Sequence, residues 1–261
     1  MPDERKRNDH SNPMEAARRL TAPPRQRRFY KIVEMRREAD GLTLRLDGKR
    51  AITPGRRPLV VPDERLADAI AVEWSAQGEI IDPATMPVTR LANSAIDGVA
   101  ERQDEVRREI LAYAGADLLC YRAEGPAGLV RRQDERWNPI LAWAERRFGV
   151  PFRLAAGIVH VAQPEPTMRR LAAEIDGYDE PFRLSGLSLA TTLTGSALLA
   201  LALSERVIDA DAAWAAAHVD EDWNISQWGE DAEAARRRAG RRVDFAAAAL
   251  ALVPLPVAGK G

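Results

Sequence analysis

Cysteine, histidine and lysine are scarce in this chain of 261 residues, and each scarcity excludes a class of site. The single cysteine, Cys120, excludes an internal disulfide and any CxxC metal site, so we expect a small buried apolar residue there. Three histidines cannot form a zinc site without carboxylate ligands, and no HExxH sequence occurs. Lysine occurs four times, and the net charge of −1 gives no overall attraction to nucleic acid or anionic membranes.

The phosphate-binding glycine loops GxGxxG and GxxxxGKS/T are missing, as is the GxSxG turn of the α/β-hydrolases. His218-x-x-Glu221 could place two metal ligands one helical turn apart, but di-iron bundles use the reverse order twice. The alternative is a histidine packed beside a carboxylate. Asp117, His218 and Glu221 remain as candidates for acid and base chemistry. The sequence nevertheless favours a protein that is not an enzyme and needs no cofactor.

The first 28 residues lack the apolar core of a signal peptide and carry eight basic and four acidic residues. The four acids argue against a mitochondrial transit peptide, because such peptides are poor in acidic residues. We therefore expect a flexible basic arm over residues 1–27 of a cytoplasmic bacterial protein.

Residues 28–92 have the pattern of a β-rich α/β domain. Apolar and polar residues alternate over 29–35, Asp47-Gly48 predicts a hairpin, and a short strand is expected at 59–61. A helix is predicted over 62–78. Its apolar face would consist of Leu66, Ala69, Ile70, Glu73, Trp74 and Gln77. We expect an antiparallel sheet of three or four strands with this helix on one side.

Residues 93–253 have helical periodicity and predict a helical domain. Apolar stripes occur over 106–118 and 137–148, and Gly149 should end the second of these helices. The predicted fold class is therefore α+β, a small N-terminal antiparallel β-rich α/β domain followed by an all-α helical bundle domain.

Three further helices are predicted towards the C-terminus. The apolar stretch over 184–203 is long enough to span a bilayer, but its six serines and threonines favour a helix buried among other helices. A later helix would place Trp214, His218, Glu221, Ile225 and Trp228 on one face. A last helix should run from about 230 to 252.

Three carboxylates lie on these apolar stripes, those of Glu73, Asp117 and Glu221. A charge that faces a core is costly unless it is paired. Each carboxylate is therefore expected either to pair with an arginine or to face a groove that binds a partner. Trp223 and Trp228 flank Glu221, and tryptophans beside charges are typical of interface anchors. At Glu221 the sequence slightly favours the partner-binding interpretation.

Arginine clusters at 25–28, 36–37 and 236–242 suggest an alternative function, a nucleic-acid-binding regulatory protein. Such a face would need its arginines aligned with stacking aromatic residues. The last cluster is interleaved with alanines and preceded by Glu230, Asp231 and Glu233. A solvated helix face is the favoured interpretation of that cluster.

A series of motifs over about residues 28–251 resembles a known family. In order they are Arg28-Phe29-Tyr30-Lys31, Leu46-Asp47-Gly48-Lys49, Thr53-Pro54, Glu73-Trp74-x-x-Gln77, Met86-Pro87-Val88-Thr89, Ala95-Ile96-Asp97, Asp117-Leu118-Leu119-Cys120-Tyr121-Arg122, Gln133-x-x-x-Trp137-x-Pro139 and Asp220-Glu221-Asp222-Trp223-Asn224-Ile225-x-x-Trp228-Gly229. No single motif is decisive, but the ordered series is specific. On these motifs the chain resembles the Atp-twelve family, the assembly chaperones of F-type ATP synthase that act on the alpha subunit of its catalytic sector.

The resemblance implies a chaperone that binds the unassembled alpha subunit and shields the surface that later faces the beta subunit. It also implies an N-terminal β-rich domain joined to a helical domain, and no nucleotide, metal or covalent chemistry. The protein would be cytoplasmic, with mitochondrial relatives in the matrix. We further expect a monomer that neither inserts into membranes nor binds nucleic acid.

The family's functionally sensitive glutamate matches Glu221 best, although Asp220, Asp222 and Glu230 lie close to it. An orphan subunit exposes a large apolar interface, so its chaperone needs a broad face with a few aromatic anchors. The predicted client-binding residues are Glu221, Trp223, Asp222, Trp228 and Glu230.

Overall fold

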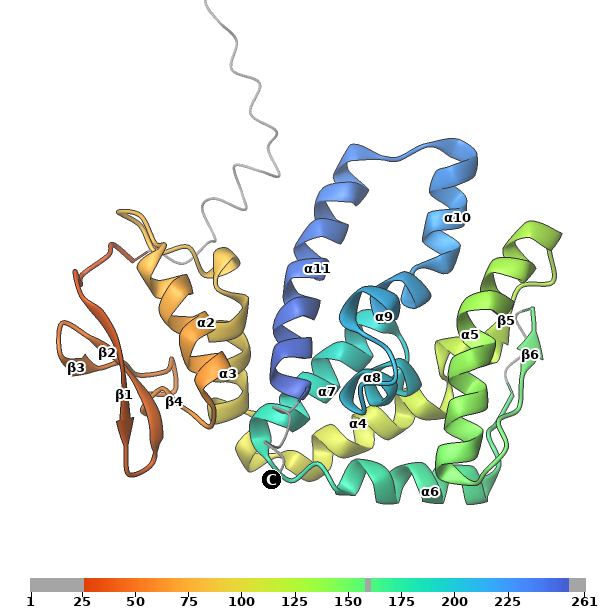
Figure 1. The fold of residues 1–261 in the computed structure, drawn as a ribbon, viewed down its shortest axis with the longest axis horizontal. Coiled ribbons are helices and arrows are strands. Elements are labelled where there is room, and N and C mark those ends of the chain that lie inside the picture. Colours follow the sequence, from red (N-terminus) through yellow and green to blue (C-terminus); the bar gives the residue numbers. More distant parts are fainter. Residues whose placement is uncertain (1–25, 158–160, 254–261) are drawn as a thin grey trace, which may run out of the picture.

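The computed structural model describes residues 26–157 and 161–253 of the chain. A small antiparallel sheet comes first and helices follow, so the predicted α+β fold class is confirmed. The sheet lies at one end of the molecule, with α2 and α3 between it and the other helices (Figure 1). The basic arm expected over 1–27 lies outside the described residues, except for Gln26 and Arg27.

The sheet is built around one central strand that pairs antiparallel with three others. The central strand is β2 (Gly41–Leu46), and its partners are β1 (Val33–Glu38), β3 (Lys49–Arg50) and β4 (Val60–Val61). Asp47 (φ 49°) and Gly48 (φ 78°) form the predicted hairpin turn in left-handed conformations. The first strand begins later than predicted, because the Asp47 carboxylate accepts the backbone N–H groups of Lys31 and Ile32.

Two helices follow the sheet. In α2 (Glu64–Ser75) the Asp63 side chain accepts the N–H of Leu66 and caps the first turn. The helix packs against the sheet and ends at Ala76, two residues before the predicted Gly78. The next helix, α3 (Pro87–Asp97), packs against α2 and also against α7 and α11. It crosses the boundary expected after residue 92, so a domain division there stays a prediction.

The rest of the described chain is mainly helical. Its helices are α4 (Gln103–Gly115), α5 (Ala127–Phe148), α6 (Glu165–Asp176), α7 (Pro181–Thr194), α8 (Ala197–Ser204), α9 (Ala210–Ala217), α10 (Val219–Trp228) and α11 (Ala232–Leu252). Short 3₁₀ turns cover Pro83–Thr85, Val99–Glu101 and Leu118–Cys120, and the two-residue strands β5 (Tyr121–Arg122) and β6 (Ala155–Ala156) pair in parallel.

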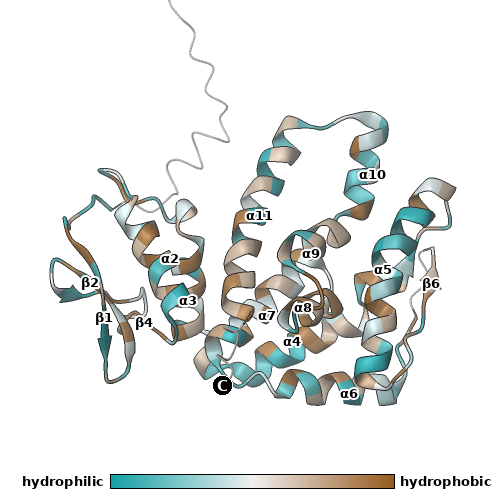
Figure 2. Cartoon of the chain, in the orientation of Figure 1, coloured by the Kyte–Doolittle hydropathy of each residue, from teal (hydrophilic) through white to brown (hydrophobic). Residues whose placement is uncertain are grey.

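The core of this helical part forms around α8, which is buried along its whole length and contacts α4, α5, α7, α9 and α11. Figure 2 shows apolar residues gathered at this centre. The predicted apolar stripe over 137–148 is confirmed, because Trp137, Ile140, Leu141, Ala144 and Phe148 are all buried in α5. Gly149 ends that helix in a left-handed conformation (φ 68°), also as predicted.

Two stretches that were each predicted as one helix are two helices. Gly195 (φ 70°) ends α7, and the Ser196 hydroxyl caps α8 by accepting the N–H of Leu199. The apolar stretch 184–203 is therefore broken, although it is buried among helices as expected. None of the described helices is long and apolar enough to cross a membrane. The second break, between α9 and α10, falls at His218.

The carboxylates of Glu73 and Asp117 face helix N-termini, so both alternatives predicted for them were wrong. Glu73 accepts the N–H groups of Val88 (2.7 Å) and Thr89 (2.8 Å) in the first turn of α3. Asp117 is fully buried and accepts the Ser196 hydroxyl (2.7 Å) and the Leu198 N–H (3.0 Å) at the start of α8. Free N–H groups at a helix start satisfy a carboxylate without an arginine.

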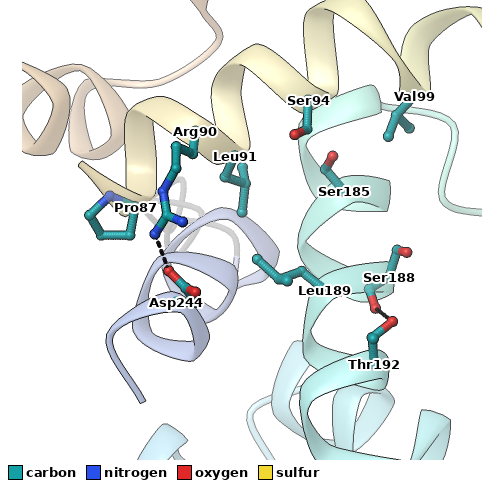
Figure 3. A pocket seen from close by; sticks show the side chains of 10 residues that line it. All are labelled: Pro87, Arg90, Leu91, Ser94, Val99, Ser185, Ser188, Leu189, Thr192 and Asp244. Atoms are coloured by element: carbon teal, nitrogen blue, oxygen red, sulfur yellow. Dashed lines mark hydrogen bonds and ion pairs between the residues drawn. The ribbon is translucent and has the colours of Figure 1, made fainter. Parts of the chain in front are cut away.

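A crevice of about 410 Å³ lies where α3, α7 and α11 meet. Arg90 of α3, which lines the crevice, points to Asp244 of α11 and forms an ion pair with it (Figure 3). The hydroxyl side chains of Ser94 and Ser185 also line the crevice. This ion pair links the first part of the chain to its last described helix.

Candidate functional site

The acidic, tryptophan-rich segment begins at a break in the helical backbone. His218 (φ −115°, ψ 22°) separates α9 from α10, so residues 210–228 do not form one continuous face as predicted. Its ring Nδ1 lies 2.8 Å from the Trp214 carbonyl oxygen and so donates to it, and the two rings stack with centroids 3.9 Å apart. Both side chains are buried, so Trp214 belongs to the core and cannot contact a partner.

Beyond the break, α10 and the first turns of α11 form a hairpin that projects from the body of the molecule, while the rest of α11 packs against α7 and α3 (Figure 1). Gly229 (φ 84°) ends α10, and the Asp231 carboxylate caps α11 by accepting the N–H of Ala234 at 2.7 Å. Only Gly229, Glu230 and Asp231 separate the two helices. The hairpin therefore presents a two-helix surface at some distance from the core.

Three contacts hold α10 against α5. Trp223 lies against Gly128, so closely that a Cβ atom at Gly128 would be 2.5 Å from the indole ring. The guanidinium group of Arg132 lies over the same ring, 4.9 Å from its centroid. One turn earlier, the Gln133 amide donates to the Asp220 carboxylate at 2.7 Å. These contacts fix the orientation of α10.

A single arginine of α11 links the two legs of the hairpin. Arg238 Nη2 lies 2.5 Å from Asp222 Oδ1, and Arg238 Nε lies 3.9 Å from Glu221 Oε2. The arginine side chain is 19% exposed, whereas those of Asp222 and Glu221 are 43% and 36% exposed. The two carboxylates thus share one cation and still reach the surface.

A groove of about 380 Å³ runs between α10 and α11. Glu221, Asn224, Ile225 and Trp228 line it from α10, Gly229, Glu230 and Asp231 from the turn, and Ala234, Ala235 and Arg238 from α11. Trp228 is 78% exposed, the highest value among the large exposed apolar side chains of the described residues. A large aromatic side chain in water beside an apolar groove marks a surface suited to binding another polypeptide.

The structure separates the five predicted client-binding residues into two groups. Glu221, Trp228 and Glu230 line the groove. Asp222 and Trp223 lie beside it, where they hold α10 against Arg238 and Gly128. The prediction missed the apolar lining residues Ile225, Ala234 and Ala235, and it missed Arg238. If a tight turn had been predicted at Gly229, the alanines of the next helix could have been placed opposite α10. No sequence signal pairs Arg238 with Asp222.

The electrostatic surroundings of His218 argue for a structural role. Burial lowers its pKa, and its Nε2 atom lies 3.9 Å from Glu221 Oε2. The ring is therefore neutral at pH 7 and acts as a packing residue beside a carboxylate. Within residues 26–157 and 161–253, no three His, Cys, Asp or Glu side chains are grouped as metal ligands. His10 and His160 lie outside those ranges.

Two of the three arginine clusters are partly neutralised by neighbouring acids. On α11, Arg238 pairs with Asp222, Arg237 with Glu233, and Arg242 with Asp211. Arg36 and Arg37 of β1 pair with Glu34 and Glu64. These ion pairs support the interpretation that the arginines lie on solvated faces. They do not favour the alternative, a stripe of arginines aligned for nucleic-acid binding.

A family model described as ATP12 chaperone protein matches residues 27–145. The crystal structure of Atp12 from Paracoccus denitrificans has 41% sequence identity and a TM-score of 0.80, with 87% of this chain and 97% of that chain covered. The chain belongs to the ATP12 chaperone family.

Two further relatives agree with membership of the ATP12 family. A putative chaperone from Agrobacterium tumefaciens is similar in structure, with a TM-score of 0.83 and 44% identity over 94% of this chain and 91% of that one. The mitochondrial protein atp12 of Schizosaccharomyces pombe is 23% identical over 223 residues, which cover 80% of this chain and 76% of the relative.

Membership confirms the resemblance carried by the sequence motifs, and the chain is therefore a chaperone of ATP synthase assembly. The family model ends at residue 145, before the α10–α11 groove begins.

Proposed function

We propose that this ATP12-family chaperone binds the unassembled alpha subunit of F-type ATP synthase through the groove between α10 and α11. The observation that carries the proposal is Trp228, which is 78% exposed at the edge of an apolar groove ringed by carboxylates. A client side chain that buries this indole would gain apolar contact at little cost to the chaperone, because the ring has few contacts of its own to lose.

The groove also provides a charge pattern. Three acidic residues line it, Glu221, Glu230 and Asp231, and Arg238 is the one basic residue in this lining. Arg238 already pairs with the carboxylates of Glu221 and Asp222. A client surface with apolar side chains and a basic residue would complement it. Because the site is small and its rim is polar, the affinity stays modest, which lets the beta subunit displace the chaperone.

The test is co-expression with the alpha subunit of the same organism, followed by affinity purification of the chaperone. The alpha subunit should be soluble and co-purify with the unaltered chain. Glu221→Ala should fold normally and lose most of the alpha subunit. Glu233→Ala, an exposed carboxylate of α11 outside the groove, is the matched control and should retain it. An alpha subunit that stays insoluble beside the unaltered chain contradicts the proposal.

The proposal also covers the oligomeric state of the protein and its cellular location. The protein would act as a monomer in the bacterial cytoplasm, where ATP synthase subunits are made, and would work by binding alone, without a catalytic step. The paired arginines support this function over a nucleic-acid-binding regulator. A nucleic-acid binder would show affinity that falls steeply with salt, so gel shifts with RNA and DNA at low salt discriminate the two.

A further inference from the structure

A second groove, of about 730 Å³, opens between the sheet and the pair of helices α2 and α3. Its floor is apolar and well packed. Buried side chains that form it are Tyr30, Leu46, Ala51, Leu59 and Met86. The groove is thus a fixed feature of the fold, not a gap between loosely packed elements.

Two large apolar side chains stand exposed on its walls. Phe29 is 59% exposed and Ile52 is 60% exposed, and both line the groove. Phe29 packs edge-on against Tyr30 with ring centroids 5.3 Å apart, and Tyr30 in turn contacts Trp74 at 5.4 Å. A row of three aromatic rings therefore leads from solvent to the floor of the groove. Such a row is typical of grooves that bind apolar side chains.

The charges along the groove are mostly positive. Lys49, Arg50 and Arg90 line it, and Asp47 is the single acid. The Asp47 carboxylate already accepts two backbone N–H groups, at 3.0 and 2.8 Å. Arg50 and Arg90 have acidic partners, whereas no ion pair of Lys49 is found among the described residues. A ligand with carboxylates beside its apolar groups complements this lining.

We infer that this groove holds an extended segment of the unassembled ATP synthase subunit in which apolar side chains alternate with, or adjoin, acidic residues. The inference rests on the proposed function and adds a second contact to it, at the end of the molecule that carries the sheet (Figure 1). Two separate contacts on one client raise the overall affinity while each stays weak enough to release in turn.

Charge argues against two other occupants. Residues 1–25 of this chain carry six basic and four acidic residues, so their net charge has the same sign as the lining of the groove. A second copy that docked face to face would set Lys49 and Arg50 against their equivalents. An acidic, apolar client segment avoids both conflicts.

The experiment compares alpha-subunit recovery for the unaltered full chain and three variants, using the co-expression described above. Phe29→Ser with Ile52→Ser should reduce the recovered alpha subunit at least fivefold, and Lys49→Glu about twofold. Leu154→Ser with Val207→Ser removes two exposed apolar side chains outside the groove and should change nothing. Circular dichroism and thermal melting verify that each variant folds.

A photo-crosslinking residue at position 52 provides a readout that does not depend on a destabilising substitution. An adduct between this position and an acidic, apolar peptide of the alpha subunit is expected. If the unaltered chain recovers no alpha subunit, the proposed function itself fails. If alpha is recovered equally by all variants, or the adduct forms with residues 1–25, with a second copy or with nothing, the groove inference alone is overturned.

Discussion

The indole ring of Trp223 rests directly on Gly128, so that the first atom of any side chain at Gly128 would lie 2.5 Å from the ring. This contact joins α10 to the start of α5 and sets the direction in which the α10–α11 hairpin projects. Trp223 thus holds α10, and with it the candidate site, in place, whereas Trp228, five residues later, is exposed to solvent.

Replacing Gly128 tests this support. Gly128→Val should push Trp223 out of place, cost about 1–3 kcal/mol of unfolding free energy and weaken client binding without altering any residue of the groove. Urea unfolding and alpha-subunit recovery measure the two effects. Gly240→Val is the matched control, because it is a helical glycine with no atom within 4 Å of its added Cβ. Equal behaviour of the two variants would show that the contact does not position α10.

Trp228→Ala should separate binding from stability. Since the ring is 78% exposed, its removal should change the unfolding free energy by less than about 0.5 kcal/mol. Binding to the alpha subunit should weaken tenfold or more if the ring is an anchor, which corresponds to about 1.4 kcal/mol. Titration of the purified chaperone against its client measures the affinity. A binding loss no greater than that of Val207→Ala would remove Trp228 from the site.

The Arg238–Asp222 pair should contribute little to stability. Asp222 is 43% exposed, so solvent screens the interaction, and a double-mutant cycle with Arg238→Ala and Asp222→Ala should give a coupling of about 0.2–1 kcal/mol. Client binding should be more sensitive, since loss of Arg238 leaves Asp222 and Glu221 without their shared cation. A coupling of several kcal/mol would instead mean that the pair is a structural element of the hairpin.

Asp117 should make stability depend on pH in the direction opposite to most carboxylates. Burial raises its pKa to about 6, above the ordinary value of 3.8, so the folded state holds this proton more tightly than the unfolded state. Its contribution to the unfolding free energy is therefore present below pH 3.8 and is lost as the pH rises to about 6.

Urea titrations of the unaltered chain and Asp117→Asn between pH 4 and pH 7 isolate this contribution. The difference in unfolding free energy between the two proteins should change across that pH interval. The unaltered chain should gain stability relative to Asp117→Asn as the pH falls. Parallel curves would mean that Asp117 has an ordinary pKa despite its burial.

Much of the fold was predictable from residues that act locally. Asp47-Gly48 can form a tight hairpin almost anywhere, and Gly149 ends a helix by its own conformational freedom. The helix break at His218 was not predictable, because periodicity continues through it, and only the tertiary packing of Trp214 and His218 reveals the change in direction.

The candidate site was predictable only in part, for a related reason. Composition indicated a tryptophan-rich acidic segment, but the division between supporting and exposed side chains depends on Gly128 and Arg132, nearly 100 residues earlier in the chain. The same limit applied to Glu73 and Asp117, whose partners are backbone N–H groups of helices that begin 14 and 80 residues later. Side-chain patterns do not encode such pairings.

Amide hydrogen exchange on the chaperone, free and in complex with the alpha subunit, tests most directly whether the α10–α11 groove holds the client. Residues 219–235 project from the body in a two-helix hairpin, so their amides should exchange readily in the free protein and slow markedly in the complex. A complex that forms stoichiometrically, yet leaves exchange over 219–235 unchanged, would contradict the account.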